Sequence, residues 1–281
     1  MTSKHILKNL LFVVSILTTS AVHASAIFDC MIEPKQTVDI ISPVSGLLEK
    51  VYVHRGDKVR KGQVLANLES SSEIAATALA QYKSELTAPT LTAQSKIEFA
   101  KRKFERRKGM LAENFMSVQE LEDAENELQL AQSELKLALE NKEVAKLEWQ
   151  QQSSLLVLRT IRSPFSGIVV EQNIYPGEFV EPGGQKKNIL KLAQLNPLRV
   201  YVIMPMKAFG KITAGMKVGI KPEHPVGGHY LGKVKIIDRI VDAASGTFGV
   251  FLEVANPKMA VPAGVKCKAD FPIRLDTLNN F

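Results

Sequence analysis

Apolar positions follow two different periods along this chain. In residues 38–70 and 156–195 they alternate with polar residues or form short runs broken by glycine and proline, which is typical of short β-strands. In residues 71–155 they recur at steps of three and four, which indicates α-helix. Residues 196–274 return to the strand pattern, punctuated by Gly, Pro and Asn. The pattern therefore predicts one β segment, a long helical segment and two further β segments.

The first two β segments repeat each other at a constant offset of 121 positions. The matched turn residues are Pro43 and Pro164, Gly46 and Gly167, Gly56 and Gly177, and Gly62 and Gly183. Glycine and proline fix turn geometry, so these matches indicate two copies of one small β unit. Each copy is too small to bury a core alone, and we expect the two halves to pack face to face.

The pattern of the helical segment predicts an antiparallel hairpin. Its downstream heptad seam consists of Leu121, Ala124, Leu128, Ala131, Leu135, Ala138, Lys142, Ala145 and Trp149. An upstream seam runs from Ile97 to Leu111, and the tip lies at about residues 109–117. Ser117 and Glu120 have the spacing of a capping box, so a second helix is expected to begin after Ser117. Pro89 predicts a break in the first helix within residues 86–90.

Charge supports this fold-back of the helices. The end of the first helix is basic, from Lys96 to Lys108, and the start of the second is acidic, from Glu120 to Glu127. An exposed ion pair contributes only about 0–1 kcal/mol, so such pairs specify the pairing more than they stabilise it. The formal net charge of the whole chain is +7, a modest excess that does not indicate nucleic-acid binding.

Residues 1–24 have the layout of a secretory signal peptide. Lys4 and Lys8 precede an apolar run from Leu10 to Leu17, and small residues follow up to Ala24. We expect cleavage after Ala24 or Ala26. The alternative is a retained anchor, although the run is shorter than the roughly 20 residues that a spanning helix needs. Residues 25–37 are expected to form an N-terminal strand or extension, and residues 275–281 a polar tail.

The two cysteines, Cys30 and Cys267, lie near the two ends of the exported chain. In a compartment that permits disulfides they could form a bridge or remain two separate buried thiols, and spacing alone leaves both open. The histidines of the mature chain, His54, His224 and His229, have no metal-ligand or catalytic-triad spacing. We therefore expect no enzyme activity, no cofactor and no bound metal.

A duplicated β unit split by a helical hairpin and followed by strands resembles the membrane fusion proteins of the HlyD and RND-pump type, the periplasmic adaptors of tripartite efflux pumps. The most specific motifs are Ile161 to Val169, Asn196 to Val200, Asp242 to Thr247, Asn256-Pro257 and Pro262 to Gly264. The resemblance implies a lipoyl-like β domain (a barrel-sandwich hybrid) carrying the hairpin, then a small β-barrel. The predicted domains are residues 38–70 and 156–195 as lipoyl-like halves, residues 71–155 as hairpin and residues 196–274 as barrel.

The resemblance also implies partners. In this family the adaptor links an inner-membrane transporter, here expected to be of the RND type, to an outer-membrane exit duct. Several copies, six by the resemblance, pack into a ring in the periplasm. A purely structural coiled-coil scaffold of the envelope, or an adaptor of a one-step protein secretion system, is the alternative. The exported substrate is not indicated by the sequence.

The family's hairpin tip carries an Arg, a Leu four residues later and a Ser seven residues after that, which are proposed to contact the duct. Arg106, Met110 and Ser117 fit this spacing with Met in place of Leu. Arg107 and Leu111 supply the Arg and Leu pair instead, but Ser117 then comes one residue early. A guanidinium can donate several hydrogen bonds to helix-end carbonyls of a partner. The alternative is that the arginines are solvated and Ser117 is only a helix N-cap.

Overall fold

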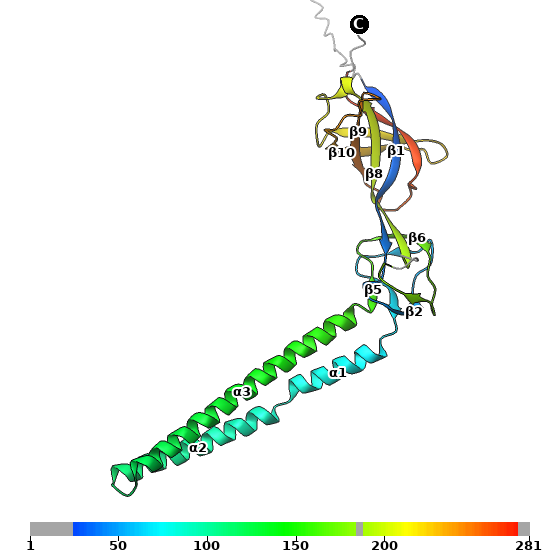
Figure 1. Cartoon of the computed structure of the whole chain (residues 1–281). Coiled ribbons are helices and arrows are strands. Elements are labelled where there is room, and N and C mark those ends of the chain that lie inside the picture. The colour runs from blue at the N-terminus through cyan, green and yellow to red at the C-terminus, as the bar shows by residue number, and fades with distance from the viewer. Residues whose placement is uncertain (1–24, 184–187, 275–281) are drawn as a thin grey trace, which may run out of the picture. The chain divides into compact units, whose positions relative to one another are not determined.

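The computed structural model describes residues 25–183 and 188–274 (Figure 1). The signal peptide expected at residues 1–24 and the tail expected at residues 275–281 lie outside the described residues. The elements are β1 Ala26–Ile40, β2 Gly46–Val51, β3 Lys58–Val59, β4 Val64–Leu68, α1 Ser71–Glu85, α2 Ala88–Ala112, α3 Val118–Val157, β5 Thr160–Arg162, β6 Gly167–Gln172, β7 Phe179–Val180, β8 Leu190–Pro205, the 3-10 helix η1 Met206–Ala208, β9 Lys217–Pro222, β10 Tyr230–Ile237, β11 Thr247–Val254 and β12 Val265–Phe271. Across the described ranges, none of the helices combines the length and the apolarity that a bilayer-crossing helix requires.

The chain divides into two compact units. One unit is Gln36–Gln194 and contains the repeated β halves together with the hairpin. The other combines the chain before Gln36 with the chain from Leu195 onward and contains the C-terminal strands. The boundaries fall inside β1 and β8, so the first unit is an insertion within the second along the chain.

In the first unit the two β halves pair with each other strand by strand. β2 pairs with β7, β3 with β6 and β4 with β5, always antiparallel. Their apolar side chains form one core to which both halves contribute, including Leu48, Leu65, Val169 and Val180. The sequence-based prediction that the halves pack together is confirmed.

The repeat is also visible in the hydrogen bonds that join the halves. The Gly56 N–H donates to the Val169 carbonyl at 2.9 Å, and the equivalent Gly177 N–H donates to the Leu48 carbonyl at 2.8 Å. Gly56 and Gly177 have φ of 95° and 91°, a left-handed conformation that glycine adopts without strain. Gly56 and Gly177 are therefore turn residues, and each half closes a turn on the other, whereas the matched Gly46 and Gly167 are the first residues of β2 and β6.

Three helices form the hairpin, with α1 and α2 following each other along α3 (Figure 1). The predicted break in the first arm is confirmed, since α1 ends at Glu85 and α2 begins at Ala88. Pro89 sits in the first turn of α2, where its missing N–H costs no helical hydrogen bond, and Leu86 before it is extended. The helices approach closely because the buried seam residues are small: Ala80, Ser84, Ala93, Ala100, Ala124 and Ala131.

Two ion pairs join α2 to α3. Lys103 pairs with Glu127, as the charge pattern predicted, and Lys96 pairs with Glu134, which lies beyond the predicted acidic run. One boundary differs from the prediction, because the strand expected from Leu156 begins only at Thr160 and α3 continues to Val157. A short apolar run such as residues 155–158 fits either helix or strand, so the preceding helix decides its conformation.

In the second unit the strands pair in the order β1, β12, β9, β10, β11, β8, and β8 also pairs with β1. These pairings close a ring of six strands around an apolar core that includes Val200, Ile220, Leu252 and Phe271. The N-terminal strand, which the sequence analysis placed outside the barrel, is one of the six. Its alternating buried residues Cys30 and Ile32 complete the core.

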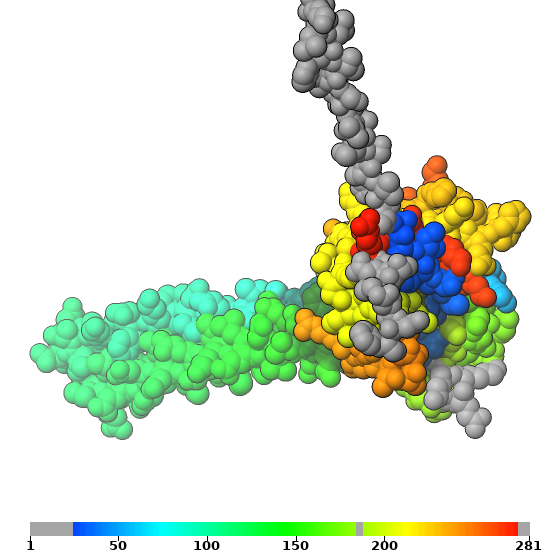
Figure 2. Space-filling model, turned by 90° about the horizontal axis from the view of Figure 1, so that it is seen from above, coloured from blue at the N-terminus to red at the C-terminus, as the bar shows by residue number. Residues whose placement is uncertain are grey.

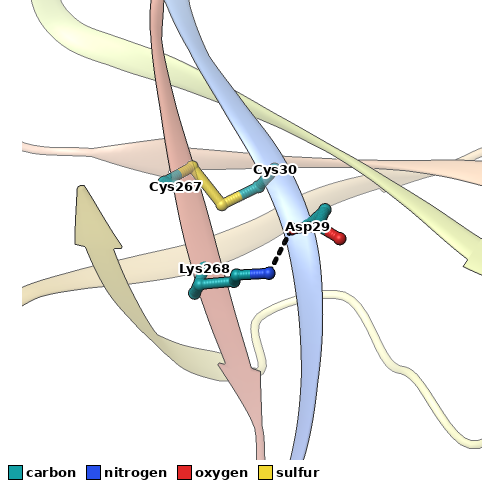
Figure 3. The surroundings of a disulfide bond; sticks show 4 residues. All are labelled: Asp29, Cys30, Cys267 and Lys268. Atoms are coloured by element: carbon teal, nitrogen blue, oxygen red, sulfur yellow. Dashed lines mark hydrogen bonds and ion pairs between the residues drawn. A yellow bond between two sulfur atoms is a disulfide. The ribbon is translucent and has the colours of Figure 1, made fainter. Parts of the chain in front are cut away.

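Cys30 and Cys267 are joined by a disulfide in this unit (Figure 3). They are direct partners in the antiparallel pairing of β1 with β12, with Cα atoms 4.8 Å apart. Both side chains point into the core and are buried. On the outer face, Lys268 pairs with Asp29 directly opposite it.

Candidate functional site at the tip of the hairpin

The tip begins where α2 ends in a Schellman motif. The Phe115 N–H donates to the Met110 carbonyl at 2.9 Å, and the Asn114 N–H donates to the Leu111 carbonyl at 3.0 Å. Asn114 has φ of 60°, the left-handed conformation that this motif requires and that asparagine tolerates better than most residues. The last carbonyls of α2 are thus satisfied, and the chain turns within a few residues.

The second half of the tip is the predicted capping box, which is confirmed. The Ser117 hydroxyl accepts the Glu120 N–H, while the Glu120 carboxylate accepts the Ser117 N–H at 3.1 Å. Hydrogen bonds from the Ser117 backbone and then from its hydroxyl hold the pKa of Glu120 below its ordinary value. The nearby Arg107 guanidinium lowers this pKa further. Ser117 is therefore an N-cap, and its hydroxyl is engaged within the hairpin.

The two arginines named by the alternative spacings have different surroundings. Arg107 is half-buried and donates from Nη1 to the Glu120 carbonyl at 2.7 Å, which joins α2 to the first turn of α3. Arg106 is exposed and makes no hydrogen bond or ion pair with any other described residue. Arg107 thus has a role inside the hairpin, whereas the Arg106 guanidinium has all its donors available to a partner.

Apolar side chains surround these charges at the tip. Met110, one helical turn after Arg106, is 46% exposed, while Leu111 is half-buried. The sequence analysis did not name Phe115, which is 75% exposed, or Val118, which is 61% exposed. Phe115 was identifiable as the aromatic residue within the polar turn between the helices. The tip therefore exposes three large apolar side chains, Met110, Phe115 and Val118, together with the Arg106 guanidinium.

The other residues singled out by sequence lie elsewhere. The repeated glycines and prolines are in the β halves of the first unit, and the disulfide is in the barrel of the second. Within residues 25–183 and 188–274, no group of three or more His, Cys, Asp or Glu side chains could hold a metal ion. The tip can accordingly offer apolar packing and hydrogen-bond donors to a partner, in a geometry fixed by two helix caps.

Comparison with known proteins places the chain in a family. The family described as the CzcB-like, barrel-sandwich hybrid domain matches residues 36–194, more than half of the chain. The cobalt-zinc-cadmium resistance protein CzcB of Cupriavidus metallidurans is 26% identical over 236 residues, which are 84% of this chain and 42% of that protein. The pyoverdine export membrane fusion protein PvdR of Pseudomonas aeruginosa is 23% identical over 207 residues, 73% of this chain and 53% of that protein.

The chain thus spans about half the length of the curated relatives it matches. Among solved structures, MacA from Actinobacillus actinomycetemcomitans superimposes with a TM-score of 0.73 at 22% identity, covering 88% of this chain and 78% of that one. The structural likeness concerns the fold: a split β domain with an inserted hairpin, and a further β unit. With the family match over the first unit, these findings show that the chain belongs to the membrane fusion proteins with a CzcB-like barrel-sandwich hybrid domain.

Proposed function

We propose that this protein is a periplasmic adaptor of a tripartite efflux system, which links an inner-membrane transporter to an outer-membrane exit duct. The observation that carries the proposal is the tip: a guanidinium with no partner among the described residues and three exposed apolar side chains, at the end of a capped helical hairpin. Such a set suits docking onto the helix ends of another protein, because Arg donates to free carbonyls while apolar knobs pack around it. The role is assembly rather than catalysis.

The proposal assigns the duct contact to Arg106, Met110, Phe115 and Val118 rather than to Arg107 and Ser117. Both of the latter already bind Glu120 within the hairpin. Replacing them would disturb the start of α3 itself, so a loss of function would not identify a contact. The transporter, expected to be of the RND type, forms the other end of the proposed assembly. The two relatives are named for different cargoes, metal cations and pyoverdine, and the proposal therefore concerns assembly alone.

The test places a photo-crosslinking amino acid at Phe115 in cells that contain the native transporter and duct. We expect an adduct with an outer-membrane protein, and the adduct should fall at least tenfold when Arg106→Asp is added. The matched control is Arg102→Asp, the same charge reversal on an exposed residue one turn earlier in α2. An unchanged adduct in Arg106→Asp, or an equal loss in Arg102→Asp, would remove the tip from the proposed role.

We further propose that copies pack side by side in a ring, expected to be a hexamer, and that the hairpins contribute to the packing. Leu130, Leu137 and Val144 are exposed at seven-residue spacing on α3, outside the buried alanine seam. Tyr82 and Leu79 are exposed on α1, away from its buried Ala80 and Ser84. Two different apolar edges on one hairpin would form a heterologous contact, which gives a ring when the rotation between neighbouring copies closes. Cysteines at Tyr82 and Leu137 should cross-link between copies but not within one.

A further inference from the structure

One end of the six-stranded ring gathers the chain segments that connect or terminate its strands. Because neighbouring strands run antiparallel, β1, β9 and β11 begin at the same end at which β8, β10 and β12 finish. The segments there are residues 206–216, residues 238–246 and residues 272–274, and we call them together the terminal end of the barrel. Figure 2 shows the start of β1, in blue, beside the last described residues, in red.

The terminal end exposes large apolar side chains at fixed positions. Ile240, in the loop from β10 to β11, is 87% exposed, the highest value among the large apolar side chains of the described residues. The loop is ordered by Asp242, whose N–H donates to the Thr247 carbonyl at 2.9 Å and whose carboxylate accepts the Ala244 N–H at 2.9 Å. Ile240 is therefore held outward by a structured turn rather than left loose.

Two further apolar residues lie in the segment after β8. Met206 and Phe209 are both exposed on either side of the buried Ala208. The Phe209 ring packs edge-on against the ring of Phe248, which fixes its position at 5.2 Å between centroids. Other large apolar side chains are exposed on the strands of the barrel, among them Leu231 and Ile236 on β10. The three at this end differ in lying beside basic side chains on the connecting segments, a combination that suits an interaction site.

Basic residues lie next to these apolar residues. Lys207 follows Met206, Arg239 precedes Ile240, and Lys211 and Arg274 lie on the same end. Lys211 donates to the Arg274 carbonyl at 3.0 Å. Lys207, Arg239 and Arg274 form no ion pair with another described residue. These segments contain two acidic residues, Asp238 and Asp242, against the four Lys and Arg, so the end is net positive.

Charge along the chain shows the same bias. Residues 36–194 contain 21 Lys and Arg against 21 Asp and Glu, whereas residues 25–35 and 195–274 contain 13 against seven. The formal positive excess of these segments thus belongs to the barrel unit. A positive unit that also presents apolar loop tips at one end has the two properties that bind a peripheral protein to an anionic membrane surface.

We propose that the terminal end of the barrel binds the surface of an anionic phospholipid membrane, with Ile240, Met206 and Phe209 entering the headgroup region and Lys207, Arg239, Lys211 and Arg274 facing the phosphates. Met, Phe and Arg also occur at protein interfaces, but lysine is depleted there. The most exposed apolar side chain, Ile240, lies in a loop beside Arg239 rather than in a packed patch, which suits a membrane surface better. The interaction goes beyond the proposed adaptor role. It requires only this protein and lipid, so it stands or fails independently of the duct contact.

The first test uses tryptophan as a local probe in the mature chain from residue 25, because the apolar run from Leu10 to Leu17 could itself enter lipid. Trp149→Phe removes the natural tryptophan, and Ile240→Trp adds one at the terminal end. We expect a fluorescence blue shift and quenching by brominated lipid with phosphatidylglycerol vesicles, and no change with phosphatidylcholine vesicles. The matched control is His229→Trp, an exposed position before β10 at the opposite end of the ring. Attachment through the hairpin or through the opposite end of the ring would not bring the Ile240→Trp probe alone into lipid.

The second test reverses charge. Lys207→Glu with Arg239→Glu should lower the vesicle partition coefficient at least tenfold, and added salt should do the same to the unmodified protein. The matched control, Lys221→Glu with Lys258→Glu, makes the same change in net charge at exposed positions near the end of β9 and in the loop before β12, toward the opposite end of the ring, and should lower the coefficient much less. An equal fall of the partition coefficient in the test variant and the control variant would overturn the proposal. So would the absence of a blue shift of the Ile240→Trp probe with anionic vesicles. A shift that needs a transporter in the vesicles would overturn it in favour of a protein partner.

Discussion

Asn256 is a single buried side chain that joins the loop between β11 and β12 to strand β8. Its Nδ2 donates to the Leu195 carbonyl at 3.1 Å and to the Val261 carbonyl at 2.9 Å, while its Oδ1 accepts the Val261 N–H. Its own N–H donates to the side chain of Asn196. The two Asn-Pro motifs of the sequence thus meet in space, which explains why asparagine is needed at both.

We predict that Asn256→Ala lowers the unfolding free energy of the barrel unit by about 2–3 kcal/mol, because it leaves buried carbonyl and N–H groups without partners. Calorimetry should show a lower Tm for one of two transitions, since the two units need not unfold together. Asn126→Ala, at an exposed position of α3, is the control and should leave the Tm of both transitions unchanged. An unchanged barrel transition in Asn256→Ala would show that these hydrogen bonds contribute little.

Glu120 is the residue at which pH acts on the tip. Its pKa is held below the ordinary value near 4.5 by Ser117 and then by Arg107. A carboxylate with a lowered pKa in the folded state contributes stability above its unfolded pKa and loses it as the pH falls through the folded value. The start of α3 should therefore begin to fray below about pH 4.5.

Hydrogen exchange of the amides at residues 118–122, followed against pH and corrected for intrinsic rates, measures this fraying. Glu120→Gln keeps a side chain that can still accept the Ser117 N–H but removes the ionisable group. In Glu120→Gln the protection of these amides against exchange should be lower than in the wild-type protein at neutral pH, and it should not change with pH between 3 and 6. A wild-type profile as flat as that of Glu120→Gln would refute the role of the carboxylate.

At the scale of elements, the two halves of the repeat are equivalent in backbone but not in surroundings. A Cβ on Gly167 would lie 2.3 Å from the carbonyl oxygen of Ala193, a backbone atom of β8. A Cβ on the matched Gly46 would lie 2.5 Å from Nη1 of Arg159, the end of a flexible side chain. We predict that Gly167→Ala destabilises the first unit by about 1–3 kcal/mol or more, as overpacking does, and Gly46→Ala by less.

Urea denaturation of both variants compares them directly, with helical circular dichroism reporting the first unit. Gly46→Ala displaces a guanidinium that donates to the Ser45 carbonyl and pairs with Glu73, so its cost is not zero. Equal losses of unfolding free energy at the two positions would mean that the β8 backbone moves aside as readily as the Arg159 side chain does.

The sequence predicts some elements better than others for physical reasons. The repeated turns, the hairpin, its break near Pro89 and the capping box all depend on local chemistry, which a sequence carries in single residues such as Gly56 and Ser117. The membership of β1 in the barrel depends on pairing with β12 at the far end of the chain, which no local pattern encodes. Which of the two arginines, Arg106 or Arg107, is hydrogen-bonded within the hairpin likewise depends on which side of α2 faces Glu120. A one-residue difference in spacing could not decide it.

At the scale of the whole molecule, the disulfide connects the two ends of a chain into which the first unit is inserted. Cys30 and Cys267 are 237 residues apart, so the bridge encloses the entire repeated β domain and the hairpin. A cross-link that closes so long a loop stabilises the folded state by about 2–5 kcal/mol, chiefly because it restricts the unfolded chain. The bridge also means that a cut anywhere between the cysteines leaves the two pieces covalently joined.

This topology gives a prediction that gel electrophoresis with and without reductant can test. Brief trypsin treatment should cut the exposed basic stretch around Arg106 and Lys108 near the tip. The cut protein should migrate as one species without reductant and as two fragments with it. Cys30→Ser should give two fragments in both conditions and a lower Tm for the barrel unit. If the nicked wild-type protein separates without reductant, the cysteines are not bridged in solution, and the pairing of β1 with β12 must hold the chain ends together by itself.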